Sequence, residues 1–304
     1  MKEKYRGIFP AFYACYEADG RVSAGRTRAL VRHLIGKGIR GVYACGSSGE
    51  CIYLDVDERK AMLEAIMDEA AGRLTVIAHV ACNNTRDSVE LARHAQSLGV
   101  DAIAAIPPIY FRLPDHAIAE YWNAISGGAP DTDFFIYNIP QLAGVALSAG
   151  LLRRMLENPR VAGVKNSSVS TQDIQVWKSI GGEDFVVFNG PDEQYVAGRS
   201  IGADGGIGGT YGAMPELYLK MHERFEAGDL AGARRIQYAC NDIIEALCSS
   251  RANMYAVIKE TLRRREGLDL GGVRAPLAGV SPEDEPVIER CCRMIDGAIS
   301  AFAG

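Results

Sequence analysis

The sequence lacks long hydrophobic runs, an excess of positive charge and closely spaced pairs of metal ligands. No stretch approaches the roughly 18 unbroken apolar residues of a membrane span, so we expect no membrane partner. The 304 residues carry a formal net charge of −5, which argues against nucleic acid as a partner. None of the eight cysteines forms a C-x-x-C motif and the five histidines are scattered, so we predict no metal site. Cysteines in apolar or helical settings and the lack of a signal-peptide pattern favour a cytoplasmic location.

Short apolar runs recur at intervals of about thirty residues over the first 210 positions. Each run is too short for a stable helix, and most are rich in β-branched or aromatic residues, which predicts strands. The eight runs occupy residues 7–12, 41–46, 74–80, 102–108, 134–140, 161–165, 185–190 and 202–209.

Helical patterns lie between these runs. Residues 57–72 and 85–99 carry apolar positions at helical spacing, and Asp55 with Glu58 predicts a capping box before the first of them. Strands that alternate with helices and are apolar on both faces indicate a parallel sheet. Eight such units predict an α/β protein with a (β/α)₈ TIM barrel. A doubly wound open sheet is the competing fold, but the even spacing favours closure.

Residues from about 213 onward contain helical patterns only, at 215–229, 230–248, 253–267 and near 284–302. These helices are too many for one crossover connection. We therefore predict a barrel over residues 1–225 and a C-terminal helical segment over residues 226–304 that packs on it. No linker separates the two parts, so they should form one continuous unit.

Polar and ionisable residues follow six of the predicted strands. In a (β/α)₈ barrel the reactive groups come from the carboxyl ends of the strands, so these stretches should meet at one end of the barrel. They are GSSGE (46–50), PPIYFR (107–112), YNIP (137–140), KNSS (165–168), NGPDE (189–193) and GIGGTYG (206–212).

Lys165 ends an apolar strand, where an ammonium group is poorly hydrated. Desolvation lowers the pKa of a lysine from about 10.4 toward 7, and the neutral amine can form a Schiff base with a ketone. The alternative is a lysine that reaches from the barrel rim into water. Tyr137 ends the preceding strand, which brings a phenol suited to proton transfer beside the amine. The GSSGE loop offers backbone N–H groups to a carboxylate.

Together, GSSGE, YNIP, GVKNSS and NGPDEQ resemble the dihydrodipicolinate synthase/N-acetylneuraminate lyase family of class I, pyruvate-dependent aldolases. The resemblance runs from about residue 5 to residue 245 and implies a barrel with C-terminal helices, usually a homotetramer. It implies no cofactor apart from the covalent Schiff base with the substrate through Lys165, and Tyr137 as the proton-transfer residue. Ser47 matches the hydroxyl linked to Tyr137, and Tyr110 matches the tyrosine that a neighbouring subunit supplies.

The resemblance also implies substrate contacts. Ser47 and Ser48 match the residues that hold the pyruvate carboxylate, and Asp192 and Glu193 match carboxylates that bind sugar hydroxyls. Without the resemblance, this acidic pair would be interpreted as a solvated helix N-terminus. The other implied substrate-binding positions are Ser167, Gly190, Ile207 and Gly209.

Leu142 stands where dihydrodipicolinate synthases carry an arginine for a second carboxylate, so the likeness is nearest the N-acetylneuraminate lyase branch. Three positions depart from that branch: Gly209 replaces a serine, Ser167 a threonine and Pro191 an aromatic residue. The change at Gly209 removes a hydrogen bond worth about 1 kcal/mol. Such changes could shift the substrate to another 2-keto sugar acid and leave the Schiff-base residues untouched.

The predicted function is therefore a lyase that cleaves a 2-keto sugar acid, N-acetylneuraminate or a related acid, to pyruvate and a sugar-derived aldehyde. The alternatives within the family are 4-hydroxy-tetrahydrodipicolinate synthase, which Leu142 argues against, and a sugar-acid dehydratase. A non-catalytic sugar-acid-binding barrel is a further alternative, but Lys165, Tyr137, Ser47 and Tyr110 together argue against it. The GGIGGTYG stretch lacks the G-x-G-x-x-G order, so we predict no nucleotide site.

Overall fold

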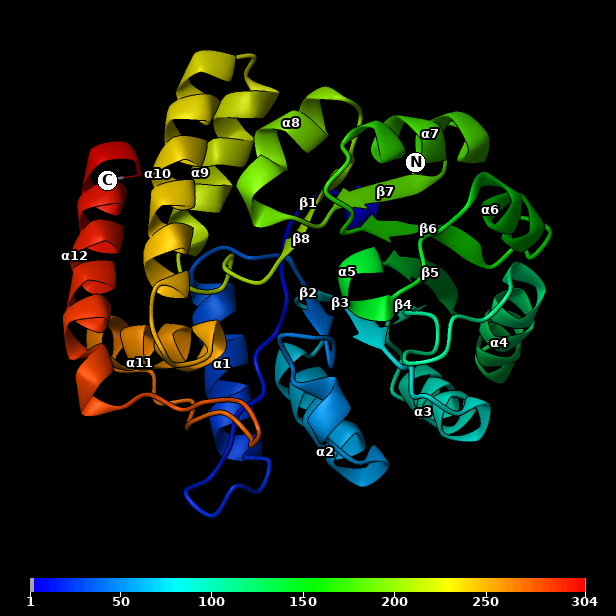
Figure 1. Cartoon of the computed structure of the whole chain (residues 1–304), viewed down its shortest axis with the longest axis horizontal. Helices are drawn as coiled ribbons and strands as arrows, with labels where there is room; N and C mark the ends of the chain where they lie inside the picture. Colours follow the sequence, from blue (N-terminus) through cyan, green and yellow to red (C-terminus); the bar gives the residue numbers. More distant parts are fainter. Residues whose placement is uncertain (1–2, 304) are drawn as a thin grey trace.

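The computed structural model describes residues 3–303, in which eight parallel strands form a barrel surrounded by helices (Figure 1). The strands pair in the order β1-β8-β7-β6-β5-β4-β3-β2, and Ala11, next to β1, forms a parallel bridge with Tyr43 of β2 that closes the ring. The predicted TIM barrel is confirmed. The strands are β1 (Gly7–Pro10), β2 (Gly41–Ala44), β3 (Thr75–His79), β4 (Ala102–Ala105), β5 (Asp133–Asn138), β6 (Val161–Asn166), β7 (Val186–Asn189) and β8 (Gly205–Gly208).

Each predicted apolar run overlaps one of these strands, although β5 begins one residue before its run and β6 ends one residue after its run. Several other strands end earlier than predicted. The run over residues 102–108 pairs only as far as Ala105, and the run over residues 41–46 only as far as Ala44. In these two runs the last residues leave the hydrogen-bonded ladder and enter the loops at the carboxyl end. These are the loops that carry the polar residues singled out above.

The capping box expected from the sequence is present, and a glycine follows three of the connecting helices. Asp55 and Glu58 form the capping box, with Glu58 N–H donating to Asp55 Oδ1 at 2.8 Å and Asp55 N–H donating to Glu58 Oε2 at 3.1 Å. Gly38, Gly99 and Gly202 have positive φ just after helices, as glycine stops require. The helices are α1 (Ala24–Gly36), α2 (Val56–Ala70), α3 (Thr85–Ser97), α4 (Asp115–Gly128), α6 (Ala149–Met155), α7 (Gln172–Gly181) and α8 (Tyr195–Ser200).

The helical patterns predicted after residue 213 are α9 (Pro215–Glu226), α10 (Leu230–Cys248), α11 (Met254–Glu266) and α12 (Glu285–Phe302). Helix α9 contacts β1 and completes the ring around the barrel, whereas α10 and α12 pack beside α9 on one side of it (Figure 1). The division at residue 225 stays a prediction. Within residues 3–303, no helix combines the length and apolarity needed to cross a membrane.

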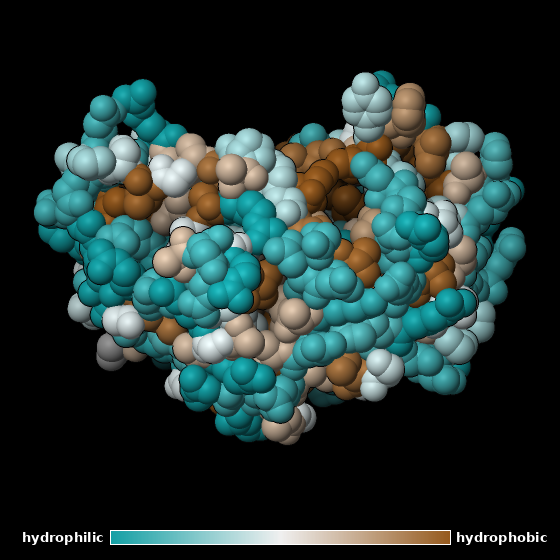
Figure 2. All heavy atoms as spheres, turned by 90° about the horizontal axis from the view of Figure 1, so that it is seen from below, coloured by the Kyte–Doolittle hydropathy of each residue, from teal (hydrophilic) through white to brown (hydrophobic). Residues whose placement is uncertain are grey.

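The core has two layers, because the barrel strands are buried on both faces. The inner layer contains large aromatic side chains, and the Phe9 and Phe188 rings meet edge to face with centroids 5.2 Å apart. The outer layer lies between the strands and the helices. On the face shown in Figure 2 most side chains are polar and the apolar ones gather in recesses. A barrel filled in this way leaves room for ligands only at its ends.

We expect Gly163→Ala in β6 to lower the free energy of unfolding by about 3 kcal/mol, because overpacking a core strand forces the backbone to move. A Cβ at Gly163 would lie 2.1 Å from the Val186 carbonyl oxygen and 2.6 Å from the Phe135 ring. Urea unfolding followed by circular dichroism measures the change. The matched control is Gly297→Ala in α12, where a Cβ meets no atom within 4 Å and should be neutral or slightly stabilising. Equal unfolding midpoints for both variants would contradict this account.

Candidate active site

Lys165 lies near the end of β6 inside the barrel and pairs in register with Tyr137 of β5. Its Nζ lies 4.0 Å from the centroid of the Tyr137 ring and 4.2 Å from that of the Tyr43 ring. The residue is 5% exposed, so the alternative of a side chain extending into water is wrong. Burial lowers the pKa of Lys165 to about 7, while the negative charge of Asp192 acts in the opposite direction. A large share of this amine is therefore neutral at pH 7 and nucleophilic.

The residues that follow Tyr137 and Lys165 lock the two strands together. Asn138 and Asn166 are register partners, and Asn138 Nδ2 donates to Asn166 Oδ1 at 2.8 Å. The same oxygen accepts a hydrogen bond from Trp177 Nε1 at 3.0 Å. Because successive strand residues face opposite sides, these amides lie on the outer face and the phenol and amine on the inner face. Their hydrogen bonds hold the phenol beside the amine.

The Tyr137 hydroxyl has two polar partners, the side chains of Ser47 and Ser167. Burial raises the pKa of Tyr137 to about 12, and hydrogen bonds with Ser47 and Ser167 act in the opposite direction. The phenol is therefore protonated at neutral pH. It can accept one proton only while it passes another to a neighbour, and the Ser47 hydroxyl is in place for that transfer.

A cavity of about 360 Å³ opens at the carboxyl ends of the strands. Leu142 of the short helix α5 (Pro140–Ala143) lines it and is 65% exposed, so it lies at the mouth. The cavity is lined by all the predicted site residues except Tyr110. These are Ser47, Ser48, Tyr137, Lys165, Ser167, Gly190, Asp192, Glu193, Ile207 and Gly209.

Asp192 and Glu193 begin a 3₁₀ turn after β7, but they differ in exposure. Asp192 is buried, and its Oδ2 accepts the N–H and the hydroxyl of Thr210 at 2.6 and 2.5 Å. Burial raises the pKa of Asp192 to about 6, while the bonds from Thr210 act in the opposite direction. Glu193 is exposed. The interpretation of the pair as a solvated helix end therefore fails for Asp192.

Tyr110 lies outside this cavity, beside a separate surface hollow of about 630 Å³. It is 90% exposed and has a φ of 84°, which is unusual for a residue with a large side chain. The single chain therefore does not bring Tyr110 to Lys165.

Two tyrosines of the site were not singled out from the sequence. Tyr43 forms one wall around Lys165, and Tyr255 of α11 accepts a hydrogen bond from Ser48 Oγ at 3.0 Å. Tyr43 lies in an apolar strand, where an aromatic residue is usually part of the core. Tyr255 lies in the C-terminal helices, which carried no signal of a role in the site. Within residues 3–303, no cluster of His, Cys, Asp and Glu side chains could hold a metal ion.

We expect Lys165→Met to be more stable than the wild type at pH 7 by roughly 4 kcal/mol. The pKa of Lys165 is about 7 in the folded protein, well below that of an unfolded lysine. At pH values between these two pKa values the unfolded chain binds more protons than the folded one. The burial of Lys165 therefore lowers the free energy of unfolding at pH 7, and this loss shrinks as the pH rises toward 10. Urea unfolding of both proteins from pH 7 to 10 should show a difference that shrinks with pH. A difference that stays constant would contradict the lowered pKa.

Comparison with known proteins assigns the chain to a family. Residues 4–294 match the model of the dihydrodipicolinate synthetase family. The N-acetylneuraminate lyase of Mediterraneibacter gnavus is 60% identical over 300 residues, which are 99% of this chain and 95% of that protein. The enzyme of the same name from Salmonella agona is 31% identical over 97% of this chain and 98% of its own length.

A solved structure, the wild-type sialic acid aldolase of Ruminococcus gnavus, superposes with a TM-score of 0.97. It is 60% identical and covers 98% of this chain and 99% of its own. The resemblance expected from the motifs is confirmed along nearly the whole chain. The chain belongs to the dihydrodipicolinate synthetase family of class I aldolases.

Proposed function

We propose that this protein cleaves N-acetylneuraminate to pyruvate and N-acetylmannosamine through a Schiff base on Lys165. One observation carries the proposal: a buried amine with a pKa of about 7 lies 4.0 Å from the Tyr137 ring in a cavity at the carboxyl end of the barrel. The identity to enzymes named N-acetylneuraminate lyase supports this substrate over the family alternatives.

The reaction begins when the neutral amine of Lys165 attacks the C2 ketone of the open-chain sugar acid. Loss of water gives an iminium ion, which withdraws electrons from the C3–C4 bond. The N–H groups of Ser47 and Ser48 bind the adjacent carboxylate, and the Ser48–Tyr255 hydrogen bond orients that loop. The chemistry needs no metal or further cofactor, because the iminium ion is itself the electron sink.

Cleavage follows proton removal from the C4 hydroxyl. Tyr137 accepts that proton while it passes its own to Ser47, and Tyr110 of the partner subunit continues the relay. The C3–C4 bond breaks, its electron pair forms an enamine and the aldehyde departs. Protonation of the enamine and attack of water on the resulting iminium then release pyruvate and restore Lys165.

The remaining cavity residues select the sugar half. Asp192 and the exposed Glu193 accept hydrogen bonds from sugar hydroxyls, because carboxylates are strong acceptors. Ser167, Gly190, Ile207 and Gly209 complete this part of the wall. Leu142 at the mouth has no charge for a second carboxylate, which disfavours aspartate semialdehyde as an acceptor.

The proposal includes a cytoplasmic homotetramer in which neighbouring chains complete each other's sites. Tyr110 and Phe111 are 90% and 71% exposed and lie together with ring centroids 5.0 Å apart. Large exposed aromatics next to a surface hollow are typical of a surface that another chain covers. A partner's Tyr110 could then reach a cavity that its own chain's Tyr110 does not line.

Borohydride added with pyruvate should attach one reduced pyruvyl group to Lys165, detected by peptide mass spectrometry. Lys165→Ala should form no adduct and lose pyruvate release from N-acetylneuraminate by at least about 10⁴-fold. Tyr137→Phe should keep the adduct but lose about 10²- to 10⁴-fold in kcat, because it removes proton transfer only. An adduct on another lysine, or turnover by Lys165→Ala, would overturn the proposal.

Co-expression of two impaired chains tests the shared site. Lys165→Ala keeps Tyr110, and Tyr110→Phe keeps Lys165, so mixed pairs of chains contain one intact site. Random pairing should restore about a quarter of the wild-type sites, which pyruvate release from the purified mixture measures. The control mixes the two proteins after separate purification, without exchange of subunits. No gain on co-expression would contradict a tyrosine supplied by a partner.

A further inference from the structure

A second buried lysine lies outside the cavity. Lys259 of α11 places its Nζ 2.8 Å from Glu50 Oε1, and the two side chains are 1% and 0% exposed. The same Nζ donates to the Gly272 carbonyl at 2.6 Å. Neither Glu50 nor Lys259 lines the cavity around Lys165. The cost of desolvating both charges offsets much of their attraction, so such an ion pair contributes little net stability, and its effect lies in the segments that it connects.

Glu50 connects its own loop, GSSGE, with three other parts of the chain: helix α11, the β1–α1 loop and the connection between α11 and α12. Besides Lys259, its Oε2 accepts the Tyr16 hydroxyl at 3.1 Å and the backbone N–H of Arg274 at 2.8 Å. Tyr16 belongs to the β1–α1 loop, and Arg274 belongs to the connection between α11 and α12, residues 267–281. The Lys259 amine and the Arg274 guanidinium lie 4.8 and 4.9 Å from the centroid of the Tyr16 ring.

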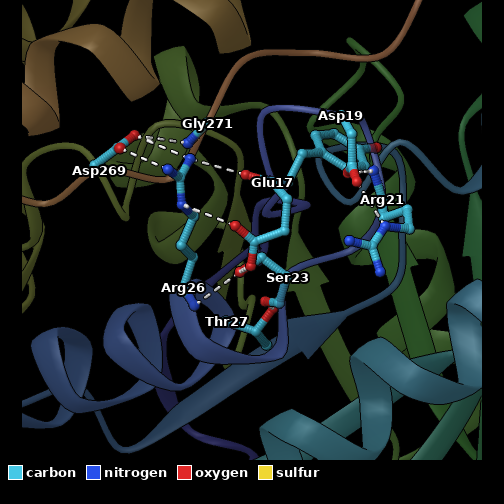
Figure 3. A network of polar contacts seen from close by, with 9 residues as sticks. Glu17, Asp19, Arg21, Ser23, Arg26, Thr27, Asp269 and Gly271 are labelled. Carbon is cyan, nitrogen blue, oxygen red and sulfur yellow. Dashed lines mark hydrogen bonds and ion pairs between the residues drawn. The ribbon is translucent and has the colours of Figure 1, made fainter.

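The α11–α12 connection is itself held against the β1–α1 loop. Figure 3 shows Arg26 between Glu17 and Asp269, and its guanidinium lies 2.8 Å from Asp269 Oδ2 and 2.8 Å from the Tyr16 carbonyl oxygen. Gly271 has a φ of 75°, and a Cβ there would lie 2.3 Å from the same carbonyl oxygen, so the backbones touch. The α11–α12 connection and the β1–α1 loop are therefore held together by contacts that do not involve Glu50.

Glu50 also ends the GSSGE loop that lines the cavity. Its φ of 54° is a strained conformation for a residue with a side chain, and its N–H donates to the Ser47 carbonyl at 3.0 Å. Tyr255 precedes Lys259 by one helical turn, so both point from the same face of α11. Helix α11 therefore contacts the loop at two points. Inside the cavity Tyr255 accepts a hydrogen bond from Ser48, and outside it Lys259 donates one to Glu50.

We propose that Glu50 and Lys259 are positioning residues that hold the Ser47–Ser48 loop and Tyr255 in the geometry that binds the carboxylate of the keto acid. The proposal rests on the proposed function, which supplies that ligand. Lys259 also neutralises Glu50, so that no unpaired negative charge lies next to the loop that receives an anion. Neither residue contacts the substrate, and both act through Ser47, Ser48 and Tyr255.

Lys259→Met should raise the KM for N-acetylneuraminate and the pyruvate concentration for half-maximal borohydride trapping by about tenfold or more. The kcat at saturation should fall by a smaller factor than KM rises, because Lys165 and Tyr137 stay in place and only the transfer from Tyr137 to Ser47 is disturbed. Lys259→Arg, which keeps the charge, should recover part of the affinity. The matched control is Lys178→Met, which breaks an ion pair of 3.1 Å with Asp204 next to the amino end of β8. It should lower the unfolding midpoint and leave KM unchanged.

The double variant Glu50→Gln with Lys259→Met removes both buried charges at similar volume, so it should fold even if the single variant does not. A raised KM in this folded protein supports the positioning role. A wild-type KM in either folded variant overturns it and leaves the pair a role in stability alone. If the wild type itself forms no borohydride adduct with pyruvate, the proposed function fails, and this proposal loses its ligand with it.

Discussion

The site depends on keeping one amine poorly hydrated. Lys165 lies between the rings of Tyr43 and Tyr137, whose faces cannot replace the hydration of an ammonium group. Holding its pKa near 7 costs the folded state roughly 4 kcal/mol at neutral pH, a large fraction of the net stability of a domain. The same desolvation keeps part of this amine neutral and opposes folding, so the rest of the barrel must offset its cost.

Packing of the barrel close to the site compensates for the cost of desolvating Lys165. The inner layer of aromatic and aliphatic side chains packs below the cavity, and a second layer lies between the strands and the helices. Asn138 donates a hydrogen bond to Asn166 on the outer face of the strands that carry Tyr137 and Lys165. A shift of one residue in this register would turn the phenol and the amine to opposite faces. Packing and register together make the arrangement both stable and specific.

Local patterns were enough to predict the eight strands, the capping box at Asp55 and the adjacency of Tyr137 and Lys165. The last followed because consecutive parallel strands present their carboxyl ends at one rim. Tyr43 could not be recognised, because the sequence alone does not show whether an aromatic in an apolar strand packs in the core or faces a ligand. The partners Ser48 and Tyr255 are 207 positions apart, and Glu50 and Lys259 are 209 apart. No periodicity connects such distant residues, so their contacts emerge only from the fold.

The C-terminal helices are therefore part of the active-site architecture, although the sequence presents them as an addition to the barrel. Strands β5 and β6 carry the proposed Schiff-base and proton-transfer residues, whereas α11 reaches the cavity through Tyr255 and the adjacent loop through Lys259. A change in α11 can alter how a keto acid is held while the environment of Lys165 stays the same. The loop that α11 contacts is the one proposed to bind the carboxylate of the keto acid, not the sugar half. The helical segment therefore affects how firmly that carboxylate is held, whereas the barrel strands position the amine and the phenol.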